Sequence, residues 1–563
     1  MSQAALLSQA HALIAKGQAG MAEARLKAEL KGGQSDYPLL EMLAYARLSQ
    51  SDPEGALRRL REAIAADSKP ANAYFNAGGV CAQMGRLQEA EEFFAKALER
   101  DPGSLQGWLA RGAALSASRR WEDGLSCYRA ALKLSPRNAE ARQGEGAMLG
   151  RMGRHAEALE SFEAALQIAS NDAGSLYNKA RSLAALNRYE EAVATYDLAA
   201  RFAPNNPKIW INRGVALEGL NRLAEAMDSY ERAAQVGRKG SQDVSAALFN
   251  KCAIMLAAGD YANGFKLYGH RVAVMNMSDT GRPIGDAPLW EGSPIQGPLR
   301  VWMEQGIGDQ ILYSRLLPLV RARAPDLHWE CERRLAGPMR RAFPEVDIRG
   351  DDNPFRDASA QISSADLATI LGLSSPKELP EAPLWSPQPE RATLLRERYI
   401  GLAQGRPIVG IAWASKNAKA GVFKGAPIEV WAPLLSQDYF FVSLQYGDVA
   451  SDIARARELF GCEIFVDDEV DQMADLEAFF AQVSALDHIA SISNTTAHVA
   501  GALGKRAQIM LPPNRGLHWY WGDKGAQCAW YPSLTLVRRD LAMSWTDQIE
   551  IAARAIETEL ASA

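Results

Sequence analysis

Small and aromatic residues recur along the first part of the chain with a period of 34 residues. The period holds in phase through six units, which start at Tyr37, Ala71, Leu105, Ala139, Ala173 and Pro207. In each unit the eighth and twentieth positions hold only alanine or glycine, the twenty-fourth holds Leu, Phe or Tyr, and the twenty-seventh is always alanine. This pattern predicts two helices per unit that touch where the small residues meet, with the large side chain filling the space beside them.

A single unit cannot bury its own apolar face, so we expect the units to stack into a superhelix. Three units close with a proline at the same offset, where it cannot continue the second helix: Pro102, Pro136 and Pro204. The period, the small residues and the prolines resemble the tetratricopeptide repeat (TPR), a pair of antiparallel helices.

The array extends beyond the six units. A weaker unit fits residues 3–36, and a last unit starts at Ser245 after a four-residue slip in phase over 237–241. We therefore predict a TPR array over residues 1–275, followed by a linker at 276–297.

From about Pro298 the period stops and short β-rich runs alternate with helical stretches. Two such cycles follow each other, so we predict an α/β region of two Rossmann-like halves, 298–403 and 404–563, that face a cleft. Residues 352–390 carry many prolines and give no clear pattern, and 507–511 is the last strand we predict. The predicted fold is therefore an α-solenoid followed by an α/β region of two Rossmann-like halves.

Composition narrows the class of protein. The chain has 563 residues and a formal net charge of −5, and no basic face recurs at the repeat spacing, so we expect no nucleic-acid partner. Its six cysteines are scattered without metal-ligand spacing, which favours a reducing compartment. No apolar stretch reaches the roughly 18 residues needed to span a bilayer, and no secretory signal is visible. We predict a cytoplasmic protein without membrane insertion.

Several segments carry a more specific resemblance: Met303–Leu312 with its Gly-Ile-Gly-Asp turn, Val442–Gln445, Ser493–Gly504, Gly259–Arg271 and Trp290–Gly292. Together they look like the heptosyltransferase-type GT-B glycosyltransferases, and more closely like bacterial proteins that join TPR units to such a domain. The resemblance implies transfer of a sugar from a nucleotide-sugar donor to a protein that the TPR array holds. Some proteins of this layout modify flagellin, with nonulosonic acids among the sugars, so flagellin is one candidate acceptor.

The first glycine turn supplies the candidate base. Asp309 follows Gly306 and Gly308, whose missing side chains let a ligand approach the backbone closely, and it matches the family's aspartate. Asp309 is also placed to cap the next helix, which is the structural alternative. Glu304, in the same turn, is a second carboxylate that could orient groups or act as the base itself.

The second motif supplies the candidate phosphate site. Thr495 and Thr496 offer hydroxyl and N–H groups at a helix N-terminus, which favours an anion, and His498 lies on the same first turn. Many relatives carry aspartate where this chain has Asn494, so a role that needs a negative charge there is in doubt. The change would suit a donor whose own sugar is anionic, such as a CMP-linked nonulosonic acid.

Three further residues complete the predicted donor site. Lys416 and Lys424 flank a loop after the first strand of the second half, where a cation would offset the charge of the leaving phosphate. Gln445 ends a strand and could touch the nucleotide. The aromatic segments 519–521 and 530–532 either close over the donor or pack the C-terminal segment onto the first half. We find no metal-ligand cluster, and the prediction is a metal-independent transferase with no cofactor besides its donor.

Two alternatives remain open. In one, the same fold transfers sugar to a lipid-linked or saccharide acceptor. In the other, the transferase region has lost its activity and the chain is a TPR adaptor. The glycine turn and the Thr-Thr-Ala-His turn argue against the second alternative.

Overall fold

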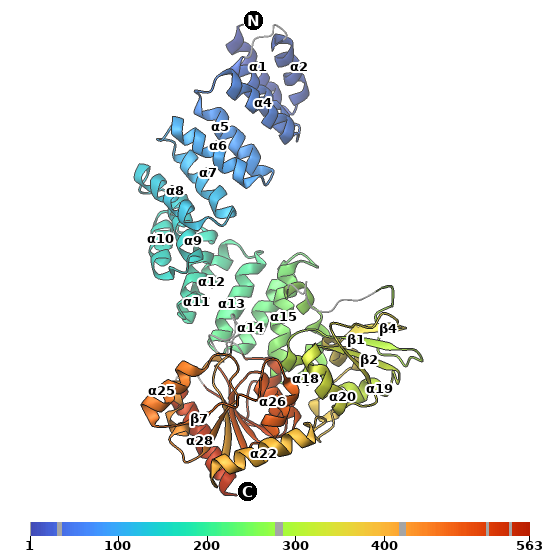
Figure 1. Cartoon of the computed structure of the whole chain (residues 1–563). Helices are drawn as coiled ribbons and strands as arrows, with labels where there is room; N and C mark the ends of the chain where they lie inside the picture. Colours follow the sequence, from blue (N-terminus) through green and yellow to red (C-terminus); the bar gives the residue numbers. More distant parts are fainter. Residues whose placement is uncertain are drawn as a thin grey trace. The chain divides into compact units, whose positions relative to one another are not determined.

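The computed structural model describes residues 2–30, 36–275, 285–415, 424–513, 517–539 and 543–562. The chain divides into two compact units, Met1–Leu220 and Asn221–Ala563. The helical array contributes to both, because its last helices belong to the second unit (Figure 1).

The array is built from helix pairs, as predicted. Its helices are α1 (Gln3–Ala15), α2 (Ala19–Glu29), α3 (Tyr37–Ser49), α4 (Pro53–Ala66), α5 (Ala71–Gln83), α6 (Leu87–Arg100), α7 (Leu105–Ala117), α8 (Trp121–Leu134), α9 (Ala139–Arg151), α10 (His155–Ile168), α11 (Ala173–Ala185), α12 (Tyr189–Phe202), α13 (Pro207–Gly219), α14 (Leu223–Val236), α15 (Gln242–Ala257) and α16 (Tyr261–Tyr268), and the short α17 (Arg271–Val274) follows. The six predicted unit starts are the first residues of α3, α5, α7, α9, α11 and α13.

The repeat positions pack as the pattern requires. A Cβ atom added at Gly78 would lie 2.7 Å from the ring of Phe94, and one added at Gly146 would lie 2.7 Å from the ring of Phe162. In both cases the eighth residue of a unit meets the twenty-fourth residue of the same unit. Glycine is therefore required here because the aromatic ring occupies the space that a side chain would need.

The α/β part of the second unit contains two parallel sheets. The first has β1 (Leu299–Trp302), β2 (Leu327–Cys331), β3 (Asp347–Gly350) and β4 (Ala360–Ser363) in the order β3-β2-β1-β4. The second has β5 (Ile408–Ala412), β6 (Phe440–Ser443), β7 (Ile464–Phe465), β8 (His488–Ile492), β9 (Ala507–Met510) and β10 (Leu534–Val537) in the order β10-β9-β8-β5-β6-β7. This second order is that of the Rossmann fold, and the first sheet has its first four strands.

Helices separate the strands. They are α18 (Ile307–Ser314), α19 (Leu317–Arg321), α20 (Ala336–Ala342), α21 (Leu367–Leu371), α22 (Pro389–Ala403), α24 (Ala432–Leu435), α25 (Ala450–Phe460), α26 (Leu476–Ser484), α27 (Thr495–Ala502) and α28 (Trp545–Ala561). Short 3₁₀ turns are η2 (Arg333–Leu335), η3 (Ser364–Asp366), η4 (Pro376–Glu378), η5 (Ile428–Trp431) and η6 (Trp519–Trp521).

Alternate residues of the six-stranded sheet enter two different cores. Val409 and Ile411 of β5 pack with α28 and α25, whereas Ile408 and Ala412 pack with α26 and α27. The sheet is therefore covered on both faces, as its uniformly buried strands require. The second of these cores is continuous with the four-stranded sheet and with α15 and α16.

The α/β prediction was wrong about the last strand, and the structure adds a strand where the sequence gave no pattern. The strand at 507–511 is not the last one, because β10 follows it, and β4 lies within the proline-rich stretch that gave no pattern. The helical stretch after the first glycine turn starts at Ile307 and is divided into α18 and α19. The second helix begins with Leu317 and Pro318, and proline is tolerated in the first turn of a helix but not in its interior.

Candidate active site

The first glycine turn joins β1 to α18 and presents Asp309 in the first turn of the helix. One carboxylate oxygen of Asp309 accepts a hydrogen bond from the backbone N–H of Gly306 at 3.3 Å. The capping role that the sequence suggested is therefore present. The side chain is still partly accessible to solvent, so capping does not prevent it from meeting a ligand.

The environment of Asp309 favours its protonated form. Burial raises the pKa of Asp309 to about 6, with a further upward contribution from Glu304, while the N–H of Gly306 and the charge of Lys424 act in the opposite direction. A carboxyl group with a pKa close to neutrality can take up and release a proton at physiological pH. Among the residues predicted for the site, Asp309 thus has the properties of a general base.

The second motif follows β8. Asn494 caps α27: its Oδ1 accepts from the N–H of Thr496 at 3.0 Å and from the hydroxyl of Ser491 at 3.1 Å. The Nδ2 of Asn494 and the Oγ of Ser493 are buried and have no hydrogen-bond partner among the described residues. Thr496 is buried, and Thr495 remains partly exposed at the start of the helix. Of the two threonines, Thr495 is therefore the one that a ligand could reach.

His498 and Gly308 bring the two motifs together. A Cβ atom added at Gly308 would lie 2.6 Å from the His498 ring, so α18 can approach α27 only because residue 308 is glycine. The Nδ1 of His498 lies 3.0 Å from the hydroxyl of Tyr531. Burial, together with His518 and Lys424, lowers the pKa of His498 to about 3, so the ring is neutral at physiological pH.

Lys424 is a cation of this region. It is buried, burial lowers its pKa, and the charge of Asp309 acts to raise it. Lys416, the other predicted lysine, lies outside the described residues. The charge of Lys424 affects the pKa of Asp309 in the first motif and that of His498 in the second, and its contact with a donor stays a prediction.

His518 was not predicted from the sequence. Its ring stacks on Tyr520 with the centroids 5.1 Å apart, and burial and Lys424 lower its pKa to about 3. His518 is nevertheless exposed to solvent, and Asp309 is partly so. No spacing motif singles out His518, so only the tertiary structure reveals it.

Two predicted residues make contacts that limit the roles proposed for them. Gln445 accepts hydrogen bonds from the N–H groups of Trp413 and Ala414, at 3.1 and 2.7 Å, and so ties the ends of β5 and β6 together. Both carboxylate oxygens of Glu304 accept from Arg271 at 2.6 Å. This geometry favours Glu304 as an orienting group over Glu304 as the base.

The aromatic segments pack against the last helices of the array. Trp519 makes edge contacts with Phe265 and Tyr268 of α16, and Trp530 makes one with Tyr261. Tyr520, Trp521 and Tyr531 of the same segments contact the ring of His498, so packing is present and closure over a donor stays a prediction. Arg271 and Tyr268, which contact the turn before Asp309, were noticed in the sequence only as part of the resemblance.

Comparisons with known proteins identify the repeats. Residues 41–104, 109–173, 151–213 and 207–236 match sequence profiles described as tetratricopeptide repeat. The N-terminal region is a TPR solenoid. Over 315 residues the chain is 30% identical to Protein FlbA of Caulobacter vibrioides (strain ATCC 19089 / CIP 103742 / CB 15), and the match covers 52% of each chain. The chain thus spans about half the length of this curated relative.

Solved structures resemble the array only loosely. A tetratricopeptide repeat protein from Parabacteroides merdae is 16% identical, with a TM-score of 0.37, over 43% of this chain and 97% of its own. The Pseudomonas aeruginosa pilF protein is 21% identical, with a TM-score of 0.32, over 37% of this chain and 94% of its own. Scores this low support no statement about what this chain does.

Among the described residues, no three His, Cys, Asp or Glu side chains converge in the way that a metal ion requires. Metal independence stays a prediction. No described helix combines the length and the apolar character needed to cross a membrane.

Proposed function

We propose that this chain is a GT-B glycosyltransferase that moves a sugar from a nucleotide-sugar donor to a protein held by the TPR array. The observation that carries the proposal is the contact of His498 with Gly308. It joins the turn after β1, with its candidate base, to the helix N-terminus after β8, with its unpaired polar groups.

The donor is assigned to the six-stranded sheet. In sheets of this order, ligands bind at the carboxyl ends of the strands where the order reverses, which here lies between β5 and β8. The N-terminus of α27 follows β8 and attracts anions through its N–H groups and helix dipole. Lys424 adds a positive charge, and the unpaired Nδ2 of Asn494 adds a donor, so a phosphate group matches what this site offers.

The reaction follows from these assignments. Asp309 accepts the proton of the acceptor's hydroxyl group while the oxygen of that hydroxyl bonds to the anomeric carbon of the sugar. The bond between that carbon and the phosphate oxygen breaks, and Lys424 and the N-terminus of α27 stabilise the charge left on the nucleotide. The proton, the sugar and the bonding electrons are all accounted for without a further reactant.

The protein acceptor is assigned to the array. Helices α1, α3 and α5 line a pocket of about 650 Å³ with apolar residues, among them Met42 and Phe75, and with polar residues that include Glu41 and Asn76. Such a lining can accept the side chains of a protein, and the inner surfaces of repeat arrays serve this purpose generally. From the resemblance alone, flagellin is the first acceptor to test and CMP-linked nonulosonic acid the first donor.

A thermal-shift series with UDP, GDP, ADP and CMP tests the donor site. A nucleotide that binds only the native state raises the melting temperature, by an amount that grows with concentration above its Kd. The Lys424→Met variant should lose most of this shift, whereas Lys377→Met, which removes an exposed lysine outside the site, should keep it. Failure of all four nucleotides to shift the melting temperature would favour the inactive adaptor.

A transfer assay tests the acceptor. The full chain is incubated with the donor whose nucleotide binds and with flagellin, and the mass of the flagellin is measured. A mass increase of one sugar residue supports the proposal. Transfer to a lipid-linked saccharide instead of protein would retain the enzyme but refute the protein acceptor.

A further inference from the structure

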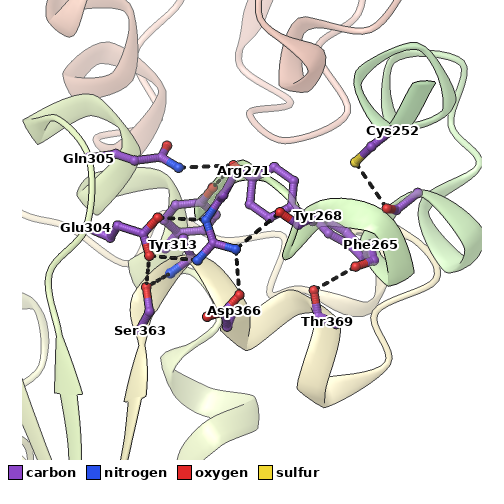
Figure 2. Close-up of polar contacts among 12 residues, drawn as sticks. Cys252, Phe265, Tyr268, Arg271, Glu304, Gln305, Tyr313, Ser363, Asp366 and Thr369 are labelled. Atoms are coloured by element: carbon purple, nitrogen blue, oxygen red, sulfur yellow. Dashed lines mark hydrogen bonds and ion pairs between the residues drawn. The ribbon is translucent and has the colours of Figure 1, made fainter. Parts of the chain in front are cut away.

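The last helices of the array end in a fully buried arginine. Arg271, the first residue of α17, has 0% of its surface exposed. Its Nε and Nη2 donate to the two oxygens of Glu304, both at 2.6 Å, and its Nη1 donates to Asp366 at 2.6 Å. Figure 2 shows the guanidinium between these two carboxylates.

The two carboxylates come from neighbouring strands of the four-stranded sheet. Glu304 follows the end of β1, and Asp366 lies in η3, directly after β4, and these strands pair with each other. The strand order reverses at this point, where an open sheet would bind a ligand. Here the side chain of Arg271, from the hairpin formed by α15, α16 and α17, lies between the carboxylates that follow these two strands.

Tyr268 makes a second connection from the hairpin to the same turn. Its hydroxyl lies 2.7 Å from the hydroxyl of Tyr313 in α18 and accepts a hydrogen bond from the Nε2 of Gln305 at 3.3 Å. Gln305 has a φ angle of 71°, a left-handed conformation that costs a residue other than glycine about 1 kcal/mol or more. The turn thus holds a strained residue whose side chain is fixed from the array.

Because these charges are buried, the arrangement is sensitive to the loss of any one partner. Removing one member of a buried ion pair leaves the other member desolvated and unpaired, and only a planar, forked donor can satisfy both oxygens of Glu304. Ser363 also donates to Glu304. The position of Glu304, and with it the path of the backbone to Asp309, is therefore defined by groups from the hairpin and from β4.

We infer that Arg271, supported by Tyr268, is a positioning residue that fixes the turn at 303–309 and thereby holds Asp309 in its reactive place. The inference rests on the proposed function for its catalytic part. It makes the hairpin of α15, α16 and α17 a structural part of the transferase rather than a spacer between the array and the enzyme.

The chain offers a matched control for this inference. Arg300 in β1 is also buried, donates to both oxygens of Glu330 at 2.7 Å, and reaches Gln361 at 2.9 Å. The same chemistry therefore occurs in the same sheet, away from the glycine turn. The two variants to compare, both in the full chain, are Arg271→Lys and Arg300→Lys, since lysine keeps the charge but not the fork.

We expect Arg271→Lys to lower kcat by about 10- to 100-fold, because a shift of about 1 Å in a reacting group can cost this much. KM for the donor should stay within about twofold, since the donor is assigned to the other sheet. Arg300→Lys should lower the melting temperature as much as Arg271→Lys does, but change kcat by less than about threefold. Equal losses of kcat in the two variants, or full kcat in Arg271→Lys, would overturn the inference.

Amide hydrogen exchange separates this inference from the proposed function. The amides of 303–309 should exchange at least about tenfold faster in Arg271→Lys than in the wild type, and at wild-type rates in Arg300→Lys. If the wild type transfers no sugar, this result still supports positioning by Arg271 and rejects only the function. Unchanged exchange in Arg271→Lys, and in the gentler Tyr268→Phe, would reject positioning whatever the activity.

Discussion

Glu23 in the array and Asp309 in the α/β region are both carboxylates surrounded by protein, and their pKa values move in opposite directions. Burial acts to raise the pKa of Glu23, but hydrogen bonds from Lys27, Gln50 and Arg47 outweigh it and lower the pKa to about 2. For Asp309 burial prevails, and the pKa rises to about 6. Hydrogen bonds from neighbouring side chains thus stabilise the charged form of Glu23 in the array. In the α/β region, the groups around Asp309 offset the effect of burial only in part, which is the environment that a proton-transfer residue requires.

The same difference extends to the other buried Asp, Glu, Lys, Arg and His side chains. Among the described residues of the first unit, Glu23 and Glu145 are buried, and both pair with arginine. The second unit buries many more: Arg271, Arg300, Glu304, Arg315, Glu330, Lys424, Asp467, His488 and His498. Packing of small and aromatic side chains therefore holds the first unit together, whereas the second unit also buries charged side chains, which costs free energy unless they are paired.

The largest expected effect is on activity. Asp309→Asn should lower kcat by about 10²- to 10⁴-fold, because the asparagine cannot accept the acceptor's proton. Wild-type kcat should rise with pH through about 6 as Asp309 loses its proton. The control is Asp347→Asn, an exposed aspartate of β3, which should keep full activity. Full activity of the Asp309→Asn variant would show that Asp309 is not the base, and would remove the functional difference between Asp309 and Glu23.

The next effect concerns packing in the array. Gly78→Ala should destabilise the first unit by about 1–3 kcal/mol, because the new methyl group meets the ring of Phe94. The neighbouring Gly79 has no atom within 4 Å of an added Cβ, so Gly79→Ala should stabilise α5 by up to about 1 kcal/mol. Denaturant unfolding of the two variants measures the difference. Similar free energies for both would contradict the packing assigned to the repeat positions.

Glu23→Gln should destabilise the array by about 1–2 kcal/mol at pH 7, through loss of charged hydrogen bonds. A carboxylate whose folded pKa is lowered adds stability above its unfolded pKa, and this contribution is lost as the pH falls from about 4.5 toward 2. The difference between variant and wild type should therefore disappear in acid. Glu29→Gln, at an exposed position of α2, serves as the control and should not change stability at pH 7 or in acid.

The effect of pH on stability is expected to be reversed at Asp309. Because its folded pKa is raised, the folded state binds the proton more tightly, and wild-type stability should fall as pH rises from about 4 to about 6. Asp309→Asn should consequently be more stable than the wild type above pH 6 and equal to it near pH 4. Unfolding at the two pH values measures this, and a variant less stable than wild type at pH 7 would argue that Asp309 serves only as a cap.

The prediction from sequence succeeded in the array, where helices that contact each other in space also follow each other closely along the chain. The unit starts at Tyr37 and Pro207 were predicted to the residue, because each helix packs against a partner about 16 residues away whose small residues mark the contact. The strands β4 and β10 were missed. Each is only four residues long, and its pairing with β1 or β9 depends on contacts far along the chain.

The candidate site shows the same division. Asp309, Asn494 and His498 could be named from their turns, because glycine turns and helix starts are local features. The sequence alone thus determined the array, the parallel α/β region and the two motifs. Only the tertiary structure decided that Gly308 meets His498, that Arg271 reaches Glu304 and Asp366, and that burial brings the pKa of Asp309 to about 6. These outcomes depend on which distant segments exclude water together, and no local pattern encodes that.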